Sequence, residues 1–153
     1  MSIATVIRDA AVFLNLSEDL LERGYRVRFR AAGTSMQPAI EDGDTITVAP
    51  VASTDVKRGD ILLSTHGQRA IAHRVVDIHI AGSEIAAFLL RGDAKGACDA
   101  PVAPDQILGK VVAIERGGGR ATPRSWCAKL IQGLHSRLKR ALASRTQGSY
   151  IRL

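Results

Sequence analysis

Aromatic side chains are scarce in this chain, since Phe, Tyr and Trp together make up only 4% of its 153 residues. The core must therefore be built from Val, Ile, Leu and Ala. With 46% hydrophobic residues, the chain can form one domain but hardly two. No apolar run approaches the ~20 residues of a membrane-spanning helix. Arg8 and Asp9 interrupt the apolar stretch from Ile3 to Leu16, which argues against a secretory signal, so we expect a cytoplasmic protein.

Cysteine is rarer still. The two cysteines, Cys98 and Cys127, show neither CxxC nor metal-ligand spacing. In a cytoplasmic protein we expect them to be reduced rather than bridged. No pair of His, Cys or acidic residues has a zinc-like spacing, so the sequence predicts neither a metal nor a cofactor.

Acidic residues are absent beyond Glu115. All 15 of them lie at or before that position, where 12 Lys or Arg leave 12 − 15 = −3, and the nine Lys or Arg beyond it give +9. The net charge of +6 is therefore a property of the C-terminal region. A basic appendage on a mildly acidic domain points to an anionic partner such as lipid or nucleic acid.

The hydrophobic pattern predicts one helix followed by strands, a mainly β (α+β) fold. Apolar spacing indicates a helix from Ile3 to Arg23 that ends at Gly24, with a break at Asn15 to Ser17. Tyr25 to Arg30 alternates with period two, as in a strand with its arginines on one face. The other predicted strands are Thr45 to Val48, Asp60 to Thr65, Ala70 to Ile80, Glu84 to Arg91 and Ile107 to Glu115.

Three glycines, Gly117 to Gly119, are interpreted as a hinge before a basic tail. Beyond them, apolar residues recur at three- and four-residue spacing, namely Trp126, Leu130, Ile131, Leu134, Leu138 and Leu142. Basic residues lie largely off that stripe, so a basic amphipathic helix is predicted. Its apolar face either packs on the domain or lies on an anionic membrane surface. Nucleic acid is the least favoured partner, because the tail has few aromatic residues and no reading motif.

Ser35, His73 and Asp99 supply a hydroxyl, an imidazole and a carboxylate in separate short motifs. Ser35 lies in Gly33-Thr34-Ser35-Met36-Gln37-Pro38, His73 follows 38 residues later, and Asp99 closes a loop that also contains Asp93. Hydrolysis of a peptide bond at neutral pH uses these three groups, because a serine hydroxyl is a poor nucleophile until an oriented base removes its proton.

These motifs resemble the type I signal peptidase superfamily, specifically the subgroup of archaea and the endoplasmic reticulum that uses His where most bacterial members use Lys. The resemblance runs from about Gly33 to Ile114 and includes Lys57-Arg58-Gly59-Asp60 as the start of a strand. It implies a signal-peptidase-like β domain in which Ser35 is the nucleophile, His73 the general base, Asp99 the acid that orients it and Asp93 a second acid. The oxyanion hole would be supported by Gly33, Thr34 and Met36.

The chain departs from this superfamily in two ways. Gly33 stands where many members have a serine whose hydroxyl assists the oxyanion hole, and losing one such donor can cost about 10²-fold in rate. No membrane-spanning helix precedes the serine motif. We therefore expect a serine endopeptidase that matures a protein or peptide precursor, with small residues such as Ala near the cut, bound peripherally to a membrane at most.

Other interpretations stay open. Ser35 alone fits a turn or helix-cap serine, and His73 alone fits a buried histidine in a strand. A lysine base is disfavoured because none of the five lysines, Lys57, Lys95, Lys110, Lys129 and Lys139, takes the place of His73. A catalytically idle binding or regulatory module is the alternative function. The expected organisation is an N-terminal helical segment (1–24), a catalytic β domain (25–116), and a hinge with a basic helical tail (117–153).

Overall fold

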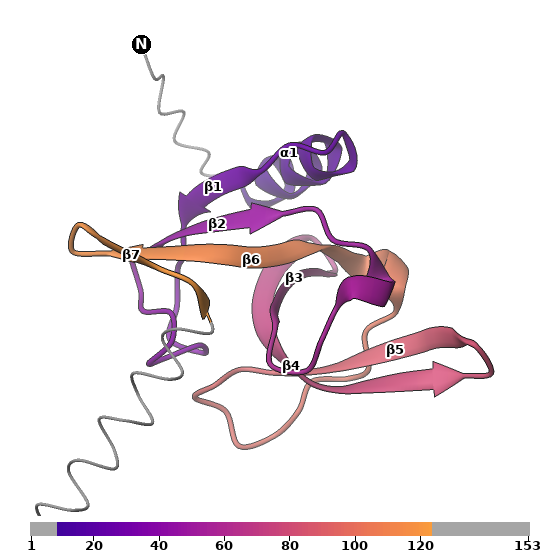
Figure 1. Ribbon diagram of the computed structural model, residues 1–153. Helices are drawn as coiled ribbons and strands as arrows, with labels where there is room; N and C mark the ends of the chain where they lie inside the picture. The colour runs from indigo at the N-terminus through magenta and orange to yellow at the C-terminus, as the bar shows by residue number, and fades with distance from the viewer. Residues whose placement is uncertain (1–8, 124–153) are drawn as a thin grey trace, which may run out of the picture.

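The structure is a computed structural model that describes residues 9–123. One helix, α1 (Ala10–Glu22), packs on a curved β-sheet (Figure 1). The strands are β1 (Val27–Arg30), β2 (Thr45–Ala49), β3 (Ile61–His66), β4 (Arg69–Ala81), β5 (Glu84–Arg91), β6 (Ile107–Arg116) and β7 (Gly119–Ala121), and two 3-10 turns lie at Ser53–Asp55 and Pro104–Gln106. The prediction of a mainly β fold with an N-terminal helix is confirmed.

Helix α1 is continuous from Ala10 to Glu22. Asp9 caps its start by accepting hydrogen bonds from the amides of Ala11 (2.8 Å) and Val12 (3.4 Å). The predicted break at Asn15 to Ser17 is wrong, because Ser17 is buried and lies between the buried turns of Leu14 and Leu21. Packing on the sheet outweighs the low helix propensity of Asn and Ser.

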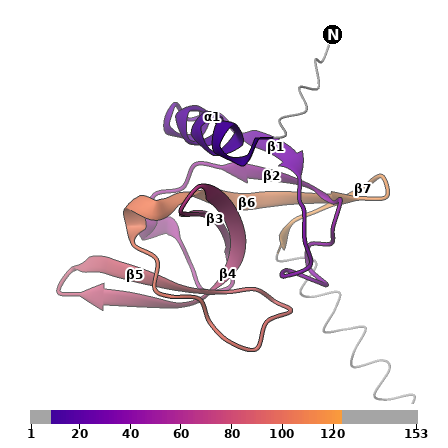
Figure 2. The ribbon, with the colours of Figure 1, turned by 180° about the vertical axis from the view of Figure 1, so that it is seen from behind.

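The strands form one antiparallel sheet in the order β1-β2-β6-β3-β4-β5, and β7 pairs with β6. Each of the six predicted strands is present: β5 has the predicted bounds, and the bounds of the other five differ by one or two residues. The β4–β5 hairpin extends from one side of the body, and the β6–β7 hairpin lies on the opposite side (Figures 1 and 2).

Two apolar clusters cover the two faces of the sheet. The first joins α1 to the sheet and contains Leu21, Met36, Ile40, Ile46, Val48, Ile61, Leu63, Val111 and Ile114. The second contains Val56, Leu62, Val75, Phe88, Leu90 and Val102. Neighbouring residues of β3 alternate between them, as side chains of a strand point to opposite faces. Aliphatic residues fill both clusters, and Phe88 is their single aromatic member.

The three-glycine segment differs from the expected hinge. Gly117 and Gly118 have positive φ values of 54° and 80° and form the turn of a hairpin, and Gly119 begins β7, which pairs with β6. The sheet therefore extends past the expected domain end at residue 116. The predicted amphipathic helix of the tail lies outside the described residues.

Candidate active site

Ser35 lies in the loop that connects β1 to β2. The side chain of its neighbour Met36 is buried in the first apolar cluster and anchors the turn to the core. The carbonyl of Ser35 accepts a hydrogen bond from the amide of Ala94 (2.9 Å), and the amide of Gln37 donates to the carbonyl of Thr34 (3.2 Å). The half-buried serine is thus held between its own turn and the loop after β5.

His73 lies in the middle of β4 and is only 2% exposed. It pairs in register with Leu62 of β3, so its ring shares the face of the sheet that carries Leu62 and Val75. Burial among these side chains restricts the rotamers of the imidazole and keeps its orientation fixed.

Asp99 is placed by pairing to the edge of the sheet. The loop after β5 returns along that strand, where the amide of Asp99 donates to the carbonyl of Leu90 (2.8 Å) and Phe88 and Val102 exchange two hydrogen bonds of 2.8 and 2.9 Å. This short extension of the ladder brings the carboxylate to the imidazole of His73.

The three groups form a chain of contacts. Oγ of Ser35 lies 3.1 Å from Nε2 of His73, and Nδ1 of His73 contacts Oδ2 of Asp99. If Nδ1 carries the ring proton and donates it to Asp99, Nε2 presents its lone pair to the serine hydroxyl. This is the geometry that a serine nucleophile with a histidine base requires.

Lys95 also contacts the acid of this chain of groups. Its ammonium lies 3.9 Å from Oδ1 of Asp99, so each carboxylate oxygen faces a different partner. The lysine side chain is about half exposed, which makes this a weak surface contact.

Asp93 does not contact His73 but binds Arg74. The guanidinium donates two hydrogen bonds to the carboxylate, from Nε at 2.7 Å and Nη2 at 2.6 Å, and a third to the carbonyl of Gly59 at 2.8 Å. This pair of parallel hydrogen bonds, the guanidinium fork, joins β4 to the start of the loop after β5. Asp93 is therefore near the three-residue site but outside its proton path.

The three expected oxyanion residues are placed differently from one another. The amide of Gly33, which has a φ of 100°, donates to the carboxylate of Asp42 (2.8 Å). Thr34 is exposed and Met36 is buried. Within residues 9–123, the amides of Ser35 and Met36 donate to no protein acceptor.

Two residues that contribute to this region were not predicted from the sequence. Gly92, which precedes Asp93 in the loop after β5, packs directly on Ser35 and His73. Arg116, the last residue of β6, binds the loop of Ser35 across 72 or more residues of sequence. Neither contact has a local sequence signal, because both depend on tertiary pairing.

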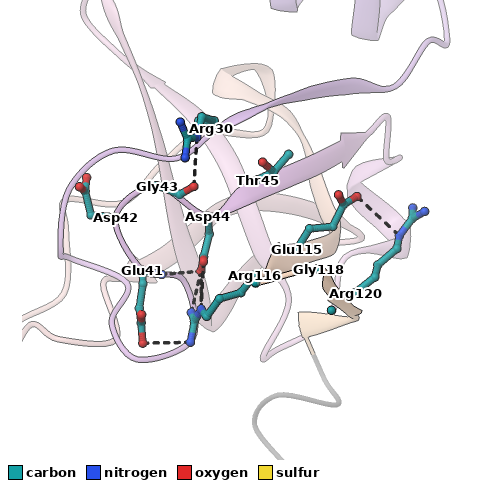
Figure 3. A pocket seen from close by; sticks show the side chains of 12 residues that line it. Arg30, Glu41, Asp42, Gly43, Asp44, Thr45, Glu115, Arg116, Gly118 and Arg120 are labelled. Atoms are coloured by element: carbon teal, nitrogen blue, oxygen red, sulfur yellow. Dashed lines mark hydrogen bonds and ion pairs between the residues drawn. The ribbon is translucent and has the colours of Figure 1, made fainter.

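A polar pocket of about 590 Å³ lies beside the same loop (Figure 3). It is lined by Arg30, Glu41, Asp42, Gly43, Asp44, Thr45, Glu115, Arg116, Gly117, Gly118, Gly119 and Arg120. Within residues 9–123, no group of three or more His, Cys, Asp or Glu is placed to hold a metal ion. No helix in that part of the chain is long and apolar enough to cross a membrane.

A family model described as Peptidase S24-like matches residues 5–86. The matched region spans more than half of the chain and includes Ser35 and His73, whereas Asp93 and Asp99 lie beyond it. No curated protein matches the chain. The match supports a serine-peptidase-like domain, which is the coarser part of the resemblance derived from the motifs. The chain belongs to the Peptidase S24-like family.

Proposed function

We propose that the protein is a serine endopeptidase of the Ser/His/Asp type that cleaves a protein or peptide precursor. The observation that carries the proposal is the continuous contact from the Ser35 hydroxyl through His73 to Asp99. The family is consistent with peptidase activity, and the signal-peptidase-like motifs suggest small residues such as Ala next to the cleaved bond.

In the proposed reaction, Oγ of Ser35 attacks the carbonyl carbon of the scissile bond while Nε2 of His73 takes the hydroxyl proton. Asp99 stabilises the imidazolium through Nδ1, and the free amides of Ser35 and Met36 stabilise the oxyanion. Collapse of the tetrahedral intermediate breaks the C–N bond, and the imidazolium protonates the leaving amine. Water, activated by His73, then hydrolyses the ester to release the acid and restore Ser35.

The first test is phosphonylation of Ser35 by a fluorescent alkyl fluorophosphonate, in which Oγ attacks phosphorus and fluoride leaves, followed by mass spectrometry of the labelled peptide. Ser35→Ala should abolish labelling, and His73→Ala should lower its rate by about 10⁴-fold. Asp99→Asn should also be severe, because the imidazole loses its orienting acceptor.

Matched controls are His79→Ala, an exposed histidine of β4, and Asp105→Asn, an exposed aspartate, both of which should label normally. Absence of labelling in the native protein, together with specific binding of a protein partner, would favour the idle module over the peptidase.

We further propose that the basic tail holds the enzyme on the cytoplasmic face of an anionic membrane. Its support is the sequence, since residues 124–153 contain seven Lys or Arg and no acid. Basic residues near an anionic leaflet contribute about 1 kcal/mol each, and apolar side chains in the headgroup region add to this.

A further inference from the structure

Arg116 connects the last residue of β6 to the loop that carries Ser35. Its guanidinium donates to Asp44, from Nε at 2.9 Å and Nη2 at 2.6 Å, and to Glu41, from Nη1 at 2.9 Å. Nη2 also approaches the carbonyl oxygens of Pro38 (3.4 Å) and Ala39 (3.5 Å). Figure 3 shows the side chains of Glu41 and Asp44 meeting the guanidinium of Arg116, and all three residues line the pocket.

Asp44 lies where the two ends of the β1–β2 loop are joined by hydrogen bonds. Its carboxylate is 4% exposed and accepts the amide of Glu41 at 2.7 Å as well as the guanidinium. Its carbonyl accepts the amide of Ala31 at 2.8 Å, and the amide of Gly43 donates back to the carbonyl of Ala31 at 2.9 Å. The two ends of the loop are thus tied together, and Arg116 ties its second half to the sheet.

Ser35 itself has few direct restraints in its own loop. The buried side chain of Met36 and the Ala94–Ser35 hydrogen bond hold the turn on one side. On the other side, the chain from Pro38 to Asp44 has no strand partner until β2 begins at Thr45. Ile40 is buried in the first apolar cluster there, and Arg116 supplies the polar contacts to the sheet. A planar guanidinium binds carboxylates and carbonyls in directions that an ammonium cannot reproduce.

We propose that Arg116 is a positioning residue for the nucleophile, acting through the loop between β1 and β2. The inference rests on the proposed peptidase function. When the guanidinium is absent, the second half of the loop loses its attachment to β6 and Oγ of Ser35 moves away from Nε2 of His73. A displacement of about 1 Å at a reacting group can cost about 10²-fold in rate.

The pocket beside Arg116 makes this residue suitable for substitution. Its guanidinium borders an open polar cavity rather than either apolar cluster, so water can occupy the space that a shorter side chain leaves. Arg116→Gln removes the charge and most of the fork, and Arg116→Lys keeps the charge but loses the fork. Arg28→Gln is the matched control, because Arg28 pairs with the neighbouring Glu115 at the exposed surface of the same sheet.

The experiment measures Ser35 phosphonylation by the fluorophosphonate as a maximal rate, kinact, and a half-saturating concentration, KI. Arg116→Gln should lower kinact by about 10- to 100-fold and change KI by less than about twofold. Arg116→Lys should recover part of kinact, and Arg28→Gln should match the native protein. Amide hydrogen exchange of residues 36–44 should accelerate in Arg116→Gln by a larger factor than exchange in β3 and β4, which reports the loss of global stability from the unpaired Asp44 carboxylate.

The proposal is overturned if kinact and loop exchange in Arg116→Gln equal those of the native protein. It is also overturned if exchange of residues 36–44 accelerates by no more than exchange in β3 and β4, since Arg116 then acts only on global stability. If the native protein is not phosphonylated, the peptidase function fails instead. Unchanged exchange of residues 36–44 in Arg116→Gln would then reject the loop attachment independently.

Discussion

Gly92 lies so close to Ser35 that no side chain fits between them. A Cβ atom on Gly92 would lie 2.6 Å from the carbonyl oxygen of Ser35 and 3.1 Å from Nε2 of His73. The backbone at this position therefore forms one wall of the candidate site. Any larger residue must displace the serine or the imidazole.

Gly92→Ala should lower the rate of Ser35 phosphonylation by about 10²-fold, because the methyl group pushes apart the two groups that exchange the proton. We expect a smaller effect on folding, about 1–3 kcal/mol, as for other overpacked sites. Labelling with the fluorophosphonate and urea unfolding measure the two quantities. Gly96→Ala is the control in the same loop, since its Cβ would meet no atom within 4 Å. Equal loss of labelling in both variants would contradict the steric explanation.

Arg74→Lys should destabilise the domain although it preserves the charge. The side chains of Arg74 and Asp93 are only 16% and 19% exposed, and one ammonium cannot replace the fork to Asp93 together with the contact to Gly59. We expect a loss of about 2 kcal/mol in the free energy of unfolding, measured by urea denaturation. Arg58→Lys makes the same substitution in an exposed ion pair, since the side chains of Arg58 and its partner Asp77 are 69% and 40% exposed. Arg58→Lys should change the free energy of unfolding by less than about 1 kcal/mol. A similar loss of stability in Arg58→Lys and Arg74→Lys would contradict the role given to burial.

Asp44 should make stability depend on pH. The hydrogen bonds from Arg116 hold the pKa of its carboxyl below the ordinary value of 3.8, against the opposing effect of burial, and the amide of Glu41 lowers it further. A lowered pKa in the folded state contributes stability that is present above the unfolded value and is lost as pH falls through the folded value.

Asp44→Asn should therefore unfold more easily than the native protein at pH 7, by about 3 kcal/mol, and the difference should shrink below about pH 4. Urea unfolding between pH 2 and 7 measures this dependence. Asp55→Asn, at an exposed position of a 3-10 turn, is the control. A difference between Asp44→Asn and native protein that stays constant across this range would exclude the carboxylate as its source.

The proposed membrane attachment predicts co-sedimentation with vesicles that contain phosphatidylserine but not with neutral vesicles. Binding should weaken as salt rises, because screening reduces the attraction of each basic residue. A chain that ends at Pro123 should lose the binding. This end keeps β7 and its pairing with β6 intact, so the truncation leaves the sheet complete. Full binding by the shortened chain would place the anionic contact elsewhere.

The parts of the fold that the sequence predicted are those with local signals. Alternating residues in β1 and longer apolar runs in β4 and β5 mark strands directly, and the motifs around Ser35, His73 and Asp99 indicated three residues that do come together. Short-range patterns are sufficient for these features, because each motif is confined to a few residues.

The parts that were missed depend on tertiary contacts. Strand β7 is three residues long and follows glycines that also fit a hinge, so pairing with β6 alone defines it. Helix α1 continues through Asn15 to Ser17 because its buried face packs on the sheet. The attachment of Arg116 to Asp44 spans 72 residues and has no periodicity to reveal it.

The pairing of Asp99 beside β5 also bears on when a newly made chain can become active. The serine and the imidazole belong to segments that precede the carboxylate in synthesis, and the Phe88–Val102 pair holds the segment of Asp99 at the edge of β5. A nascent chain that has not yet exposed residue 99 therefore has an imidazole without its acidic partner. In the proposed peptidase, the site is complete only once this edge pairing has formed.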